Sequence, residues 1–169
     1  MQLKGIHHSA YRCRDAEETR AFYEDLLGLP LAAALKFDEE PGTGKKHPYV
    51  HLFFRMPDGN FFAFFDAPDS AAPEKFEIVH GFDRHVAFEV GSLAELDEWK
   101  AKFRAAKVPC FGPIDHEFVQ SIYFTDPNGL PLEITARVER HDAIMAHEAE
   151  GARAVLDAWA AEKAGGARN

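Results

Sequence analysis

The sequence has only two cysteines, Cys13 and Cys110, among its 169 residues. A disulfide framework therefore does not hold the fold together, and a reducing compartment such as the cytoplasm is the expected location. No stretch approaches the about 20 apolar residues that cross a bilayer, and no signal-peptide pattern is recognisable. We therefore expect neither a membrane anchor nor secretion.

Positive charge is also scarce. Lys and Arg number 19 against 28 Asp and Glu, which gives a formal net charge of −9. Proteins bind nucleic acids and anionic membranes through clustered Lys and Arg side chains. We expect neither kind of partner here, which leaves a small molecule or another protein.

Phenylalanine, by contrast, is abundant, with 15 residues against 4 tyrosines. Successive side chains of a strand point to opposite faces, so a Phe-Phe doublet places one ring on each face. We expect the strands that carry such doublets to be covered on both sides. Three doublets fall within one short span: Phe53-Phe54, Phe61-Phe62 and Phe64-Phe65.

The segment Ser121–Ile134 predicts a β-hairpin. Its centre, Asp126–Gly129, reads Asp-Pro-Asn-Gly, in which proline pre-sets φ while Asn and Gly accept positive φ. Glu133 alternates with apolar residues in the second strand, and Tyr123 does so in the first. The alternation predicts that this carboxylate and this phenol share one face of the sheet.

The two halves of the chain show the same order of elements. Residues 3–12 predict a strand, and a capping box at Asp15 predicts a helix that stops at Gly28. Strands at 29–37, 49–55 and 60–66 follow. The second half gives a strand at 84–90, a helix with a capping box at Ser92, a strand at 108–114 and the hairpin.

Equivalent positions are separated by nearly constant intervals. His8 and His85 are 77 positions apart, whereas the turn glycines Gly59 and Gly129 are 70 apart. The difference of seven residues fits an insertion in the polar segment 38–47, which we expect to be a surface loop. A duplicated pair of βαβββ modules explains this pattern.

The expected fold class is α+β, with two βαβββ modules and a helix outside the repeat. That helix carries an apolar side formed by Val155, Leu156 and Trp159, which favours docking on its own domain or on a second copy in a homodimer. The expected boundaries are 1–67 for the first module, 68–82 for a linker, 83–138 for the second module and 139–169 for the helix and tail.

Three residue positions suggest a metal centre. The repeat places His8 and His85 at equivalent sites, and it places Glu133 opposite Ala63. Two imidazoles and one carboxylate form the facial triad that binds Fe(II) or Mn(II) and leaves coordination positions open. Zn(II) or Ni(II) would accept similar groups.

Residues 3–136 resemble the vicinal oxygen chelate superfamily, which includes glyoxalases, bleomycin-resistance proteins and extradiol dioxygenases. The matching motifs are IHHSAYRCRDAEETRAFYEDLLGLPL, RHVAFEV and SIYFTDPNGLPLEI. The resemblance implies that the paired modules form a cupped mixed sheet around one divalent metal held by His8, His85 and Glu133. Within the doublet His7-His8, the second histidine matches the family, and strand alternation predicts that His7 faces the opposite side.

The resemblance is closest to extradiol dioxygenases. Glyoxalase-type lyases take a fourth ligand from the first module, and Ala63 cannot ligate. Extradiol enzymes use three ligands and carry a tyrosine ten residues before the glutamate, where this chain has Tyr123. This implies an Fe(II) enzyme in which a catechol-like substrate chelates the metal, Tyr123 hydrogen-bonds the bound oxygen, and O₂ takes the remaining position.

The general acid–base residue is a separate question. His116 lies just before the tyrosine strand and titrates near neutral pH, so it is the candidate. Where ring-cleaving enzymes carry a second catalytic histidine, this chain has Asn60, which orients a ligand but cannot shuttle a proton. His51 on the neighbouring strand is an alternative if it faces the substrate pocket, and a loop or core role stays open for both histidines.

Other functions of the same superfamily stay open. A fosfomycin-resistance thiol transferase is the second choice, although such enzymes carry a threonine two residues after the first metal histidine, where this chain has Ala10. A glyoxalase-like lyase or isomerase is a further alternative. A non-catalytic binding protein of the bleomycin-resistance kind is disfavoured because such members lack the metal ligands.

Overall fold

The computed structural model describes residues 2–68 and 72–166. Residues 69–71 of the expected linker and 167–169 of the expected tail lie outside the described part. The chain forms two units, Met1–Val86 with Phe124–Leu132, and Ala87–Tyr123 with Glu133–Asn169. Each unit is described by itself below.

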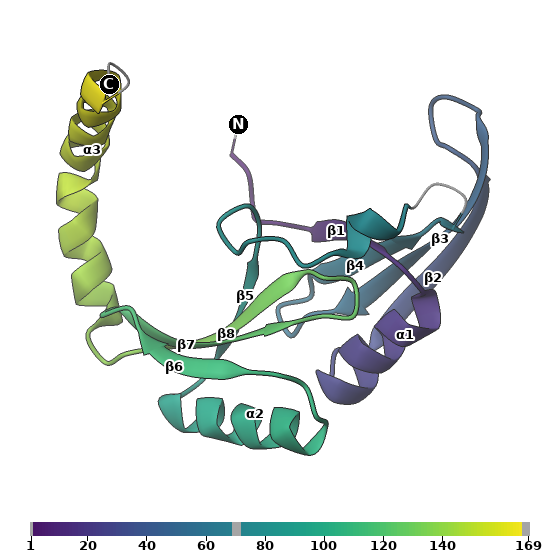
Figure 1. The fold of residues 1–169 in the computed structure, drawn as a ribbon, viewed down its shortest axis with the longest axis horizontal. Helices are drawn as coiled ribbons and strands as arrows, with labels where there is room; N and C mark the ends of the chain where they lie inside the picture. Colours follow the sequence, from purple (N-terminus) through teal and green to yellow (C-terminus); the bar gives the residue numbers. More distant parts are fainter. Residues whose placement is uncertain (1, 69–71, 167–169) are drawn as a thin grey trace. The chain divides into compact units, whose positions relative to one another are not determined.

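The first four strands form one sheet (Figure 1). Its order is β1-β4-β3-β2, in which β1 runs parallel to β4 and the other pairs are antiparallel. A parallel pair needs a crossover connection, whereas the antiparallel strands follow one another through short turns. The strands are β1 (His8–Cys13), β2 (Leu31–Glu39), β3 (Lys46–Arg55) and β4 (Phe61–Asp66).

The last four strands repeat this arrangement in the order β5-β8-β7-β6. The two final hairpins also close alike: Gly59 N donates to Met56 O at 3.0 Å, and Gly129 N donates to Asp126 O at 3.1 Å. The repeat and the α+β class are thereby confirmed. The strands are β5 (Val86–Val90), β6 (Phe111–Asp115), β7 (Val119–Thr125) and β8 (Pro131–Arg137).

The first helix begins where its capping box predicts. The Asp15 carboxylate accepts a hydrogen bond from Glu18 N at 2.7 Å, ahead of α1 (Ala16–Arg20). The helix then widens into a π-helical segment, η1 (Ala21–Leu26), in which Leu27 N donates to Phe22 O at 3.0 Å. A short 3₁₀ turn, η3 (Pro73–Phe76), lies in the connection to the second sheet.

The second helix, α2 (Leu93–Ala105), begins after Ser92, but the predicted capping box is wrong in detail. Ser92 makes no side-chain cap; its hydroxyl donates instead to the Glu95 carboxylate at 3.2 Å. One side of α2 packs into the core, where Leu96 and Phe103 are buried.

The third helix, α3 (His141–Gly166), is the predicted helix outside the repeat. Its apolar residues Val155, Leu156 and Trp159 are exposed. Within residues 2–68 and 72–166, none of the helices combines the length and the apolarity that crossing a membrane requires.

The core of the first unit lies on the helix side of its sheet. Tyr23 is fully buried, with its ring 4.7 to 5.4 Å from those of Phe54, Phe62 and Phe64. The other ring of each Phe doublet, on the opposite face, is only half-buried; these rings are Phe53, Phe61 and Phe65. The expected cover is therefore complete on one face alone, which leaves an aromatic face partly open.

Candidate active site

The open face of the first sheet begins at His8. The strand register places His8 beside Phe61 and Ala10 beside Ala63, and Phe53 pairs with Ala63 from the other side. The His8 ring lies 5.6 Å from that of Phe53 in an edge-to-face arrangement. The first candidate ligand therefore borders an aromatic surface.

His51 lies within this aromatic surface. Its ring stacks on Phe65 at 3.8 Å and lies 4.1 Å from Phe53 and 6.0 Å from His8. Burial, and next the charge of His8, lower the pKa of His51. Its Nε2 atom is buried and has no hydrogen-bond partner among the described residues. A neutral imidazole thus faces the same side as His8 with one polar atom unsatisfied, which is costly unless a ligand pairs with it.

His7 does not face the opposite side, so that expectation is wrong. Strand β1 starts only at His8, and strand alternation does not extend to the residue before it. The His7 Nδ1 atom lies 2.9 Å from His8 Nδ1, and its ring lies 5.6 Å from that of Phe61. His7 is therefore a neighbour of His8 that restrains the orientation of its ring.

His85 lies just before β5, as His8 lies at the start of β1. The His85 Nδ1 atom is 2.7 Å from Gly81 O. A backbone carbonyl only accepts, so this contact requires the tautomer with hydrogen on Nδ1 and a lone pair on Nε2. Metal-binding histidines are commonly oriented by such a hydrogen bond from the other ring nitrogen.

The remaining candidate site residues, His116, Tyr123 and Glu133, lie in the second unit. His116 Nε2 lies 2.6 Å from the Tyr123 hydroxyl, although seven residues separate the two in the chain. Phe111 stacks on the Tyr123 ring at 5.0 Å and 20°. Glu133 is buried with 7% of its surface exposed, and its charge raises the pKa of the Tyr123 phenol. Ser121 and Thr135, which lie two positions from Tyr123 and Glu133 on their strands, are hydrogen-bonded at 3.0 Å. The predicted shared face of Tyr123 and Glu133 is confirmed.

Tyr123 is held in its protonated form. Burial is the first cause that raises the pKa of its phenol, and the Glu133 charge is the second. The phenolic oxygen lies 2.6 Å from Nε2 of His116, and the Glu133 carboxylate is near enough to act on the phenol through its charge. Tyr123 is therefore close to both an imidazole and a buried carboxylate.

Asn60 does not join this group. Its backbone N and its Nδ2 atom both donate to the Asp58 carboxylate at 2.9 Å, in the turn between β3 and β4. The amide that was a candidate substrate contact is therefore part of the turn. Sequence reasoning also missed Phe111, whose only signal was an aromatic residue at the start of the neighbouring strand.

The side chains of His8, His85 and Glu133 are of the kinds that bind a divalent metal. Within residues 2–68 and 72–166, no three His, Cys, Asp or Glu side chains form a group that would hold a metal ion. The three candidates belong to different units, His8 and His85 to the first and Glu133 to the second. The fit rests on the buried carboxylate of Glu133 and on the tautomer of His85, which presents the nitrogen lone pair that a metal requires.

Comparisons with known proteins decide the family. Residues 5–134 match the Glyoxalase/Bleomycin resistance protein/Dioxygenase superfamily. The uncharacterized protein YwkD of Bacillus subtilis is 32% identical over 136 residues, which cover 79% of this chain and 98% of YwkD. The chain belongs to this superfamily.

Two further proteins that are similar to this chain have names that state different functions. The putative ring-cleaving dioxygenase MhqA of Bacillus subtilis is 27% identical over 142 residues, 82% of this chain but only 42% of MhqA. The structure of the fosfomycin resistance protein FosX from Listeria monocytogenes, complexed with Mn(II) and sulfate, has a TM-score of 0.60 at 18% identity. That match covers 84% of this chain and 99% of FosX and shows a shared fold.

Proposed function

We propose that this protein is a metal-dependent dioxygenase that opens the ring of a catechol-like small molecule. The observation that carries the proposal is the 2.6 Å contact between His116 and Tyr123, beside the buried Glu133. Ring opening by dioxygen first requires a hydroxyl of the substrate to lose its proton. A phenol that contacts an imidazole on one side and a carboxylate on the other is built for that transfer.

In this proposal the proton passes from the substrate through the Tyr123 hydroxyl to Nε2 of His116. The Tyr123 hydroxyl takes a proton from a substrate hydroxyl while it releases its own proton to Nε2 of His116. The Glu133 charge raises the pKa of Tyr123 and thereby favours the protonated phenol before and after each transfer. His116 then returns the proton to the product.

The aromatic face of the first unit suits an aromatic substrate. Phe53 and Phe65 provide ring surfaces for edge-to-face or offset stacking, and His51 between them offers an unsatisfied nitrogen for a substrate hydroxyl. A planar ring with adjacent hydroxyls matches both features. We therefore propose an aromatic diol in preference to an aliphatic substrate.

His8, His85 and Glu133 are the proposed metal ligands, and Fe(II) is the proposed ion. When bound, Fe(II) supplies Lewis acidity toward the catechol oxygens and a route for electrons between the ring and dioxygen. The name of MhqA supports the reaction class, and the Mn(II) in the FosX structure supports a divalent ion in this fold. Ala63 offers no fourth side-chain ligand, which leaves coordination positions to the substrate.

The test is reconstitution with Fe(II) under anaerobic conditions, followed by oxygen-electrode and absorbance assays against a panel of catechols. We expect uptake of one O₂ for each catechol consumed, because both oxygen atoms enter the product, together with a yellow ring-fission chromophore. Activity should disappear in Glu133→Ala. The acid limb of the pH–rate profile should change in His116→Gln.

Failure has two distinguishable forms. If the metal binds but no catechol consumes oxygen, the dioxygenase reaction is wrong, and thiol transfer to fosfomycin or glyoxalase-like isomerisation becomes the reaction to assay. If oxygen uptake occurs with an identical pH profile in His116→Gln, the proton route through His116 is wrong.

A further inference from the structure

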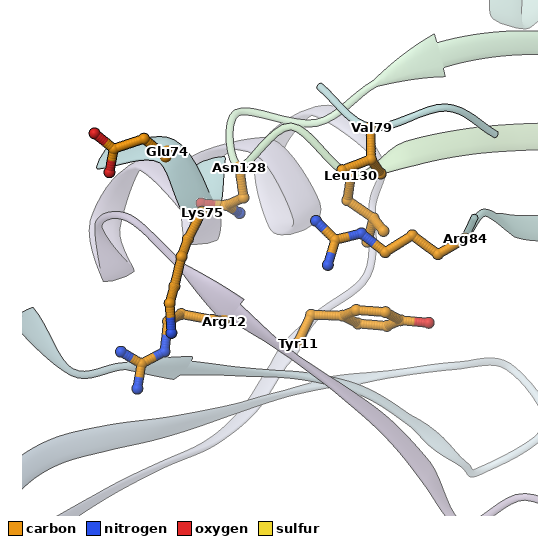
Figure 2. Close-up of a pocket in the computed structure, with 8 residues that line it drawn as sticks. All are labelled: Tyr11, Arg12, Glu74, Lys75, Val79, Arg84, Asn128 and Leu130. Atoms are coloured by element: carbon orange, nitrogen blue, oxygen red, sulfur yellow. The ribbon is translucent and has the colours of Figure 1, made fainter. Parts of the chain in front are cut away.

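The first unit contains a cavity of about 320 Å³ that the proposed reaction does not use (Figure 2). Its lining comes from β1, from η3 and the segment after it, and from the turn before β8. Tyr11 lies three positions after His8 in β1, so strand alternation places it on the opposite face of the sheet. The lining residues are Tyr11, Arg12, Glu74, Lys75, Val79, Arg84, Asn128 and Leu130.

The lining is positively charged on a strongly acidic protein. It holds three cations against one carboxylate, whereas the whole chain carries a net charge of −9. Figure 2 shows the Glu74 carboxylate pointing away from the space that Lys75 and Arg84 border. Within the described residues, neither the Lys75 ammonium nor the Arg84 guanidinium forms a hydrogen bond or an ion pair. Two uncompensated cations at one cavity attract an anion.

The walls of the cavity are held in place. The Asn128 side chain accepts a hydrogen bond from Arg14 N at 2.8 Å and donates to the Asp126 carboxylate at 2.9 Å. Gly129, at φ +76°, lies so close to the end of η3 that an added Cβ would stand 2.5 Å from Phe76 O. The turn and the segment that carries Lys75 are thus packed together before any ligand arrives, which lowers the entropic cost of binding.

The remaining walls are apolar or weakly polar. The Tyr11 ring packs on Phe62 at 5.3 Å, which fixes the phenol at one side of the cavity. Val79 and Leu130 contribute aliphatic surface. A ligand with a charged head and a small apolar body matches this lining better than a bare inorganic ion does.

We propose that this cavity binds a small organic phosphate monoester, with Lys75 and Arg84 contacting the phosphate and Val79 and Leu130 contacting the organic group. The two positive charges of Lys75 and Arg84 favour a dianion over a carboxylate. A guanidinium offers two parallel N–H donors to phosphate oxygens, and an ammonium adds a compact point charge. This binding is independent of the proposed metal centre.

The test is calorimetric titration of metal-free protein with phenyl phosphate at fixed ionic strength, because screening alters the affinity of exposed charges. We expect saturable binding, with weaker binding of benzoate and inorganic phosphate and none of phenol. Lys75→Gln and Arg84→Gln should each weaken phenyl phosphate binding by roughly tenfold, the loss of one charge-assisted hydrogen bond.

Matched variants separate this site from general charge effects. Lys163→Gln and Arg153→Gln make the same charge changes on the exposed helix α3 and should leave the affinity unchanged. His8→Ala removes a proposed metal ligand and should also leave it unchanged. Unchanged affinity in both Lys75→Gln and Arg84→Gln would overturn the proposal, and equal affinity for benzoate would overturn the preference for a dianion.

Discussion

The two modules share one topology and differ in the chemistry of equivalent positions. In the first sheet Phe53 pairs with Ala63 across neighbouring strands. Seventy positions later the equivalent residues are Tyr123 and Glu133, where the charge of the carboxylate raises the pKa of the phenol. An apolar pair in one module thus corresponds to an acid–base pair in the other.

The two modules also differ in the side chains that surround their equivalent histidines. The first module keeps a histidine, His8, and surrounds it with aromatic rings that suit a planar ligand. The second keeps the equivalent His85 and adds a buried carboxylate and a phenol–imidazole contact. In the proposed function, the first module contacts the substrate ring and the second module transfers the proton.

The largest expected effect is on turnover, when Tyr123 in the second module is replaced by the phenylalanine that stands at the equivalent position of the first. Tyr123→Phe removes the hydroxyl between Glu133 and His116, so turnover should fall by about 100-fold or more while the metal stays bound. The measurement is kcat together with metal content. The reciprocal change, Phe53→Tyr, should leave turnover within a small factor of the wild type. Equal rates in Tyr123→Phe and wild type would contradict the proton route.

The opposite exchange tests whether the first module tolerates a carboxylate. Ala63 is fully buried and pairs with Phe53 on one side and Ala10 on the other. Ala63→Glu should therefore lower the free energy of unfolding by about 3 kcal/mol, because an unpaired charge would be buried. Urea denaturation measures this loss, and Ala63→Gln serves as the size-matched neutral control. A wild-type midpoint for Ala63→Glu would show that the face accommodates a fourth ligand.

The two hairpin turns offer a third comparison. The Asp126 carboxylate accepts four hydrogen bonds, from the Tyr23 hydroxyl, the Asn128 backbone and side chain, and Leu130 N. Asp126→Asn replaces one acceptor oxygen with a donor group that faces other donors, and it should lower the free energy of unfolding by about 2 kcal/mol.

The matched control for that change is Asp58→Asn in the first turn, where the carboxylate is exposed. It should cost less than about 0.5 kcal/mol. Urea midpoints of the two variants give the comparison directly. Similar losses in both turns would mean that the Tyr23 contact adds nothing to the stability of the second hairpin.

The smallest expected effect concerns His51, whose equivalent in the second module is Ser121. Burial and the His8 charge lower the pKa of His51 in the folded protein below its unfolded value of about 6.5. The unfolded chain then binds more protons, so metal-free protein should lose stability as the pH falls through and below that value.

His51→Phe should flatten this slope, whereas Ser121→Ala should leave it intact. Urea midpoints at a series of pH values between about 7.5 and 5 cover the window. An unchanged slope in His51→Phe would show that other groups carry the acid sensitivity.

Sequence reasoning predicts the fold well because its signals are local. The capping box at Asp15, the turn at Asp126 and the strand alternation around Glu133 each act within a few residues, and the structure confirms them. The boundaries differ where local signals compete. Strand β3 starts at Lys46, before the predicted residue 49, because pairing of Glu39 with Lys46 extends the ladder into the expected loop.

The candidate site is less predictable because its contacts join distant residues. Spacing alone marked Tyr123, but the contact of His116 with it depends on how the β6–β7 hairpin closes. The hydrogen bond of Tyr23 with Asp126 spans 103 positions and leaves no trace in either local pattern. The cavity beside Lys75 and Arg84 lies partly in a segment without periodicity, which sequence reasoning reads only as a linker.

The most direct test of the account is the metal content of single variants after anaerobic loading with Fe(II) and gel filtration. We predict one Fe(II) per chain in the wild type and in His7→Ala, whose side chain only restrains His8. His8→Ala, His85→Ala and Glu133→Ala should each lose stoichiometric Fe(II) while keeping a wild-type circular dichroism spectrum. Full occupancy in all three variants would contradict a metal centre shared by the two modules.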